Sequence, residues 1–261
     1  MPLYSATCPL PKNQMLRRHQ ASAPFSPADI TGLSLWLKAD AGVTLSGSNV
    51  TAWADQSGQG KTATGVIGEE PTIVTNSLNG KTGIQFNGTQ TMVTNSILTL
   101  AYNTPVTIIG VAKASGSDVV TQDVARWFVT IGNNNDLAEG LTFGPYGGTP
   151  AFGGLIGGAG IGDTDILYSN MGENEAGLAV AINDGINFNY YHNGESVGSQ
   201  EIIWTETTAV NSFSIATQKY EGSHIFYSKC VIYELIVYDS ALSAQDKQAV
   251  ETYLNDKYAI Y

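Results

Sequence analysis

Residues 231–258 constrain the fold of this chain more than any other stretch. The first eight read Val-Ile-Tyr-Glu-Leu-Ile-Val-Tyr and are mostly β-branched or aromatic. That composition is typical of a buried strand. We therefore expect a core strand over Val231–Tyr238 that ends in the polar turn 239–243.

A short amphipathic helix is predicted directly after this turn. Ser243, followed three residues later by Asp246, has the spacing of a helix N-terminal cap. The apolar residues that follow recur every four positions and make one stripe: Val250, Leu254 and Tyr258, with Tyr253 beside them. We expect the helix, over Ala244–Tyr258, to fold back onto the body of the protein.

The composition favours many short strands over helices. The chain has 261 residues, of which 29 are glycine and only 13% are charged, a balance suited to strands and tight turns. It could hold one large all-β domain or two small ones, and it is long enough to bury a sizeable core. No run of about 18 apolar residues predicts a membrane span. The net charge of -11 argues against nucleic acid as a partner.

The first 28 residues differ from the rest. They contain five prolines, the cations Lys12, Arg17 and Arg18, and no Asp or Glu. Such a segment is too rich in proline and too polar to form its own core. It can be read as a disordered leader, but we favour an N-terminal arm over 1–28 that docks on a neighbouring subunit or on its own domain, 29–261. Arg17 and Arg18 are the candidates for contacting an acidic neighbour.

The start of the chain and its cysteines suggest where the protein is made. Pro9 and Pro11 stand where a signal peptide would have its apolar region, so no signal peptide is expected. Cys8 and Cys230 do not make a disulfide framework, and free thiols are the expectation. We expect synthesis in a reducing cytosol.

Two early segments read as a strand and a tight turn. In Leu33–Lys38 alternation should place Leu33, Leu35 and Leu37 on one face and Trp36 on the other. Asp55 opens the turn sequence Asp-Gln-Ser-Gly-Gln-Gly. It could contact a metal or a ligand, but the favoured interpretation is a side chain that accepts hydrogen bonds from its own turn.

Further strands and turns follow along the chain. The strongest β runs are 106–112 and 127–132, and later strands are expected at 178–182 and 188–191. The segments 213–216 and 224–227 lead into the closing strand. Tight turns are marked by Asn79-Gly80, Asn87-Gly88, Asp184-Gly185 and Asn193-Gly194. His192 flanks the last of these turns, where a solvated imidazole is expected.

The glycine-dense tract 132–162 is expected to be the least regular part of the body. Long loops on a rigid scaffold often carry binding sites. The candidate sugar ligands are amide, carboxylate and aromatic side chains: Asn134, Asn135, Asp136 and Tyr146. Asp136 with Asp163 or Asp165 could supply oxygens to Ca²⁺, although no EF-hand spacing supports this. A surface loop without a ligand is an equally good interpretation.

Four ordered motifs resemble one family. They are Leu-Trp-Leu-Lys-Ala-Asp with Trp-Ala-Asp-Gln-Ser-Gly-Gln-Gly, then Asn-Gly with Ile-Gln-Phe-Asn-Gly, then Tyr-His-Asn-Gly, and the closing strand followed by Tyr-Asp-Ser-Ala-Leu-Ser. Together they resemble concanavalin A-like (laminin-G-like) domains of phage virion and bacterial surface proteins. The resemblance covers about residues 30–260. It implies a two-sheet antiparallel jelly-roll sandwich with a short C-terminal helix.

The sequence lacks the catalytic motifs of that fold. Its glycoside hydrolases usually carry Glu-x-Asp-x-x-Glu on one strand, and this pattern is absent from the sequence. The three histidines, His19, His192 and His224, have no metal-ligand spacing. No Gly-x-Ser-x-Gly or phosphate-binding loop occurs. We therefore expect a protein that is not an enzyme and needs no cofactor.

The resemblance and the expected cytosolic synthesis together suggest a non-enzymatic structural protein of a phage virion, in the capsid or tail. Its arm would bind other virion proteins, within a homo-oligomer or symmetric assembly, and its sandwich would hold host surface glycans. The alternatives are a cement protein without a ligand, a polysaccharide-degrading enzyme of the same fold, and a secreted bacterial adhesin.

Overall fold

The structure is a computed structural model that describes residues 24–100, 104–114, 126–132, 138–146, 149–157, 166–170, 175–202, 210–220, 223–225 and 227–261. Its elements in chain order are η1 (Pro27–Asp29), β1 (Leu33–Lys38), β2 (Val43–Ser46), β3 (Asn49–Trp53), β4 (Ala63–Gly65), β5 (Thr72–Leu78), β6 (Lys81–Asn87), β7 (Met92–Leu100), β8 (Val106–Ala114), β9 (Arg126–Gly132), β10 (Ala138–Tyr146), β11 (Thr149–Gly157), β12 (Ile166–Asn170), β13 (Ala176–Asn183), β14 (Asn187–His192), β15 (Glu195–Glu201), β16 (Val210–Ile215), β17 (Gln218–Tyr220), β18 (Ser223–Ile225), β19 (Lys229–Tyr238) and α1 (Ala244–Tyr258).

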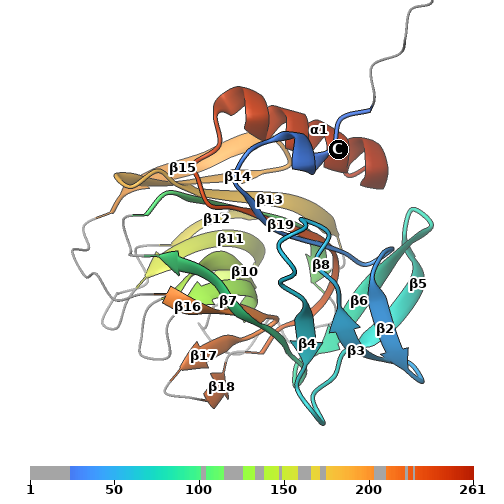
Figure 1. Ribbon diagram of the computed structural model, residues 1–261. Helices are drawn as coiled ribbons and strands as arrows, with labels where there is room; N and C mark the ends of the chain where they lie inside the picture. The colour runs from blue at the N-terminus through green and yellow to red at the C-terminus, as the bar shows by residue number, and fades with distance from the viewer. Residues whose placement is uncertain are drawn as a thin grey trace, which may run out of the picture.

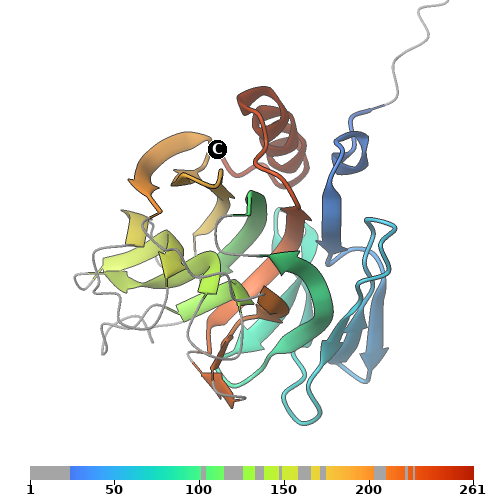
Figure 2. The same cartoon turned by 60° about the vertical axis from the view of Figure 1, so that its left-hand side comes forward.

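The strands form two layers. Within the described residues, all paired strands are antiparallel. One layer runs β15–β14–β13–β8–β19, where β19 also pairs with β1 and β6. The other runs β4–β7–β16–β9–β10–β11–β12. Strand β3 connects the two through β4 and β5. Figures 1 and 2 show α1 lying across the outside of the first layer. The predicted all-β sandwich with a C-terminal helix is confirmed.

Alternation along β8 divides the core in two. Ile108 and Ala112 belong to the cluster between the two layers, while Ile109 and Val111 belong to the cluster beneath α1. Successive side chains of a strand point to opposite faces, so one strand serves both clusters. Such a strand reads as a continuous apolar run, which explains why 106–112 is so strong a β signal.

The C-terminal strand and helix form as predicted. All residues of β19 after Lys229 are buried. Val250, Leu254 and Tyr258 on α1 are at most 1% exposed and pack in the cluster beneath the helix. Ser243 caps the helix by accepting a hydrogen bond from the backbone N–H of Asp246 at 3.1 Å. Within the described residues, no helix is both long and apolar enough to cross a membrane.

The expected side-chain alternation of β1 is wrong at one residue. Leu35 and Leu37 pack between the two layers, but Leu33 lies with Trp36 in the cluster beneath α1. The register of β1 against β19 shifts between Leu33 and Leu35. A bulge adds one residue to a strand and so reverses the faces on either side of it.

The expectation of an irregular tract over 132–162 is also wrong. Strands β10 and β11 occupy much of it, and β10 pairs with β11 from Ala138↔Gly157 to Tyr146↔Thr149. Strand β10 pairs on its other side with β9. A ladder needs only backbone N–H and C=O groups, so neighbouring strands can hold a glycine-rich segment that local propensity assigns to a loop.

The segment before β1 is anchored on the helix side of the molecule. Ser26 starts η1 with reciprocal hydrogen bonds to Asp29. The Tyr238 hydroxyl donates to the carbonyl of Pro27 at 2.9 Å, and the rings of Phe25 and Tyr253 meet edge to face at 6.3 Å. Residues 24–30 are therefore part of the folded body. Residues 1–23, with Arg17 and Arg18, lie outside the described residues, so the arm over 1–28 stays a prediction.

Candidate functional site

The predicted sugar-binding residues are mostly beyond what the structure describes. Asn134, Asn135 and Asp136 lie outside the described residues, as do Asp163 and Asp165. Tyr146 is the last residue of β10, where its backbone pairs with Thr149. Sugar binding by these four side chains therefore stays a prediction.

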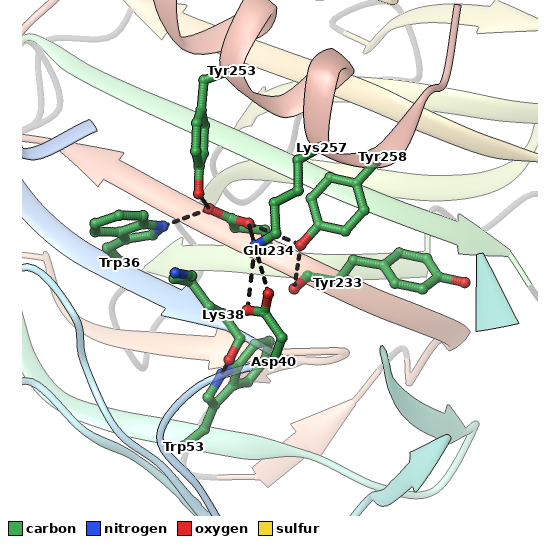
Figure 3. A network of polar contacts seen from close by, with 9 residues as sticks. All are labelled: Trp36, Lys38, Asp40, Trp53, Tyr233, Glu234, Tyr253, Lys257 and Tyr258. Atoms are coloured by element: carbon green, nitrogen blue, oxygen red, sulfur yellow. Dashed lines mark hydrogen bonds and ion pairs between the residues drawn. The ribbon is translucent and has the colours of Figure 1, made fainter. Parts of the chain in front are cut away.

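Glu234, in the middle of β19, is the centre of a polar cluster beneath α1 (Figure 3). Its side chain is fully buried. Oε1 accepts hydrogen bonds from the indole N–H of Trp36 at 2.6 Å and from the hydroxyl of Tyr253 at 3.0 Å. Oε2 accepts from Lys257 at 2.7 Å and from the hydroxyl of Tyr258 at 2.8 Å.

This arrangement is suited to holding the helix rather than to catalysis. A carboxylate offers about four acceptor positions, and here four donors fill them. Burial, followed by the negative charge of Glu234, raises the pKa of both Tyr253 and Tyr258, so both phenols keep the protons that they donate. Lys257 also contacts Asp40 at 3.1 Å, and the 41% exposed side chain of Asp40 brings the cluster to the surface.

Only one local signal in the sequence points to this cluster. A glutamate stands alone among apolar residues of the strand 231–238. A charged residue in a buried strand needs a partner. The partner Lys257 could not be chosen in advance, because nothing local specifies which turn of the helix lies above Glu234.

Asp55 has the structural role favoured by the sequence. It accepts hydrogen bonds from the backbone N–H groups of Trp36, Ser57 and Lys61 at 2.8–3.1 Å, and from the hydroxyl of Ser57 at 2.7 Å. Burial alone would raise its pKa, but these hydrogen bonds together lower it. Asp55 therefore stays ionised and ties its turn to β1.

His192 differs from the solvated turn residue that was expected. Its ring is partly buried at the end of β14, and Nδ1 lies 2.7 Å from the hydroxyl of Ser169 on β12. Burial lowers the pKa of His192 to about 4, and the nearby charge of Glu175 offsets only part of that shift. A general base works best with a pKa near the working pH. At neutral pH this serine–imidazole pair is therefore better suited to joining β12 and β14 than to catalysis.

A further polar cluster lies at the end of the molecule remote from α1. Glu69, in the loop between β4 and β5, accepts a hydrogen bond from the hydroxyl of Tyr227 through Oε2 at 3.1 Å. The same oxygen lies 3.7 Å from Nδ1 of His224 on β18. The Glu69 side chain is 34% exposed. Burial, then the hydrogen bond and charge of Glu69, raise the pKa of Tyr227 to about 12, so the phenol donates at neutral pH.

Of these polar groups, the one around Glu69 is best placed to contact a ligand. Glu234 and Asp55 use their acceptor positions within the protein, whereas Glu69 uses one oxygen and is partly exposed. No local pattern in the sequence reveals this cluster, because Glu69 and Tyr227 are 158 positions apart. Among the described residues, no group of three His, Cys, Asp or Glu side chains could hold a metal ion.

Comparisons with known proteins support the fold. No protein-family model and no curated protein sequence matches the chain. Solved structures do match it. The receptor-binding domain of a botulinum neurotoxin C/D mosaic serotype has a TM-score of 0.57 at 14% identity, over 86% of this chain and 51% of that one.

Two further structures give the same picture. Trypanosoma rangeli sialidase in complex with sialic acid has a TM-score of 0.59 at 14% identity, over 87% of this chain and 33% of the sialidase. The binding domain of Paraclostridial Mosquitocidal Protein 1 has a TM-score of 0.55 at 13% identity, over 89% of this chain and 53% of that one. This chain thus spans a third to about half of the chains it matches. At these identities the likeness is one of fold.

Proposed function

We propose that this protein is a non-enzymatic binding module whose β-sandwich binds carbohydrate. The observation that carries the proposal is the shared fold with a receptor-binding domain and with a sialidase that was solved with sialic acid, in each case over more than four fifths of this chain. The hydrogen bonding supports it. The carboxylates of Asp55 and Glu234 are held by donors within the protein, which suits a rigid scaffold rather than general acid or base catalysis.

The proposed setting is a phage particle. It rests on the resemblance of the sequence motifs to virion domains and on the proline-rich, basic segment 1–28. Because residues 24–30 are anchored beside α1, the segment that precedes them starts from the helix side of the sandwich. A basic segment joined to an acidic body is suited to contact with other virion proteins, within a symmetric assembly. Arg17 and Arg18 are the proposed contacts.

Carbohydrate binding is tested with a glycan array probed by the full-length protein. The proposal expects retention on a defined set of glycans, with no cleavage of the bound glycans on prolonged incubation. Retention with cleavage would instead assign a polysaccharide-degrading enzyme of the same fold. A protein that binds no glycan but reinforces particles would be a cement protein.

The virion setting is tested with purified particles from which this protein has been stripped. Full-length protein is compared with a chain that begins at residue 24, which keeps Phe25 and Pro27 in place on the body. The Arg17→Gln/Arg18→Gln double variant is the finer probe. Binding that requires residues 1–23 and the two arginines supports the anchoring arm. Equal binding by all three chains assigns the interface to the sandwich. No binding by any of the chains contradicts the virion setting.

A further inference from the structure

The end of the sandwich remote from α1 carries a rigid, partly exposed group of polar and aromatic side chains. In both views the β17–β18 hairpin lies at the bottom and α1 at the top (Figures 1 and 2). His224 of β18 and the neighbouring Tyr227 meet Glu69 of the β4–β5 loop there. The group therefore lies away from the anchored residues 24–30.

The backbone around Glu69 is fixed without help from its side chain. Its N–H donates to the carbonyl of Val66 at 2.8 Å, and its carbonyl accepts from the N–H of Thr91 at 3.0 Å. A second link joins the same segments, from the N–H of Val66 to the carbonyl of Thr91 at 3.4 Å. The loop is thus held by an internal turn and by two bonds to Thr91, the residue before β7, and a substitution of the Glu69 side chain leaves these bonds intact.

The carboxylate itself is oriented from one side only. Tyr227 and His224 both approach Oε2, and their rings meet edge to face at 6.4 Å. Within the described part of the chain no hydrogen bond reaches Oε1 of Glu69. A carboxylate held by one oxygen and exposed at 34% can accept a hydroxyl hydrogen of a ligand without first being reorganised.

The same loop also offers an exposed apolar side chain. Ile67, two residues before Glu69 in the sequence, is 94% exposed. A sugar ring presents hydroxyl groups around its edge and C–H groups on its faces, so it needs both acceptors and apolar contacts. Glu70 follows Glu69 directly, and its carboxylate accepts from the N–H of Gly68 at 2.9 Å. Two adjacent negative charges disfavour an anionic ligand.

We infer that the loop 66–70, with Tyr227 and His224, is a subsite for a neutral sugar, bound through hydroxyl groups that donate to Glu69 and through contact with Ile67. The inference rests on the proposed carbohydrate-binding function and assigns a place and a ligand class to it. The subsite uses other residues than those of the tract 133–165, in which the sequence predicted the sugar contacts. It also faces away from the side of the molecule where residues 24–30 are anchored, as a displayed binding site requires.

The test is an NMR titration of the full-length protein, with labelled backbone amides and isoleucine methyl groups. The probes are galactose, mannose, glucose and N-acetylglucosamine and their short oligosaccharides, with 3′-sialyllactose against lactose as the anionic pair. The expected result is a saturable shift of the Ile67 methyl and of the Gly68 and Glu69 amides with at least one neutral sugar. If lactose is a neutral sugar that binds at this place, it should bind more tightly than 3′-sialyllactose.

Variants decide whether Glu69 carries the binding. Glu69→Gln keeps the shape and one acceptor oxygen but removes the charge, and it should weaken binding at least about tenfold, as expected for losing a charged hydrogen-bond acceptor. Tyr227→Phe removes the donor that orients Glu69 and should weaken binding less. Glu195→Gln, an exposed glutamate in the β14–β15 hairpin, removes the same charge elsewhere and should leave binding unchanged.

The outcomes separate this inference from the function on which it rests. Sugar binding that shifts other residues and is unchanged in Glu69→Gln overturns the subsite and leaves the carbohydrate-binding proposal standing. A panel in which no sugar shifts any residue overturns both. Tighter binding of 3′-sialyllactose than of lactose at Ile67 overturns the assignment to neutral sugars.

Discussion

At the scale of single residues, the carboxylates of this protein divide by what surrounds them. Glu234 is fully buried and accepts four hydrogen bonds, while Asp55 accepts its four near the surface from its own turn and β1. Glu69 is partly exposed and uses one oxygen. The same chemical group thus holds the helix at Glu234, stabilises a turn at Asp55 and is a candidate ligand contact at Glu69. Burial and the number of donors distinguish the three roles.

Glu234→Gln should destabilise the protein strongly, although it only replaces one carboxylate oxygen with an amide nitrogen. The amide N–H₂ must face either Lys257 with Tyr258 or Trp36 with Tyr253, and all four are donors. Buried donors without an acceptor cost about 3 kcal/mol or more of unfolding free energy here. Urea unfolding of the variant measures the loss. Glu195→Gln, at an exposed position, is the matched control, and an equal small effect in both variants would contradict the anchoring role of Glu234.

His192 should make the stability depend on pH in the acid range. Its pKa is about 4 in the folded protein and 6.5 when unperturbed. A lowered histidine pKa means that the unfolded chain binds the proton first, so stability is complete above about pH 6.5 and falls as the pH drops towards 4. Allowing for partial exposure, the loss is up to about 2 kcal/mol.

The measurement compares urea unfolding of the wild type with that of His192→Asn between about pH 7 and pH 4.5. The variant lacks the titrating ring, so the stability difference between the two proteins should shrink as the pH falls. If the stability difference between the two proteins stays constant over this pH range, His192 does not cause the pH dependence of stability.

At the scale of elements, the helix α1 is held by an apolar row and a polar cluster at the same time. Val250, Leu254 and Tyr258 fill the space above β8, β13 and β19, while Tyr253 and Lys257 reach Glu234. The polar contacts fix which turn of the helix lies over β19, because a shift along the sheet would leave the buried carboxylate without donors. The apolar row supplies most of the attraction.

Leu254→Ala tests the apolar row. The side chain is fully buried, and its loss should cost about 2–4 kcal/mol of unfolding free energy through lost burial and the cavity left behind. Thr252→Ala, on the exposed side of the same helix, should change stability by no more than about 0.5 kcal/mol. Thermal or urea unfolding of the pair measures the contrast, and similar losses in both would mean that the row does not hold the helix.

At the scale of the whole molecule, the two ends of the sandwich differ in what they offer. The end at α1 carries the anchored residues 24–30, while the other end carries the β17–β18 hairpin and the loop around Glu69 (Figure 1). A module with its chain entry at one end and exposed polar groups at the other is suited to attachment on one side and recognition on the other. The proposed carbohydrate subsite, inferred from the contacts of Glu69, lies at the end opposite residues 24–30.

The anchoring of residues 24–30 should be visible in stability. A chain that begins at residue 31 lacks the contact of Phe25 with Tyr253 and the acceptor for the Tyr238 hydroxyl. Compared with a chain that begins at residue 24, it should lose about 2 kcal/mol of unfolding free energy. Urea unfolding of the two chains checks this. Equal stability would show that the segment is only loosely attached and would remove the argument that the arm starts from the helix side.

The sequence by itself determined the strands and helix whose signals are local. The apolar run of β8, the buried strand β19, the cap at Ser243 and the stripe on α1 were all predicted, and so were the turn at Asn193-Gly194 and the role of Asp55. Each depends on residues a few positions apart. Chain geometry then fixes which side chains share a face or a turn.

Only the tertiary structure decided the features that depend on distant partners. The bulge that moves Leu33 to the helix side is set by the register against β19. Strands β10 and β11 form in a glycine-rich tract because β9 and β12 offer ladders to pair with. The hydrogen bond from Trp36 to Glu234 and the one from Tyr227 to Glu69 join segments 198 and 158 positions apart along the chain. Such contacts are specified by packing of the whole sandwich, which local spacing does not encode.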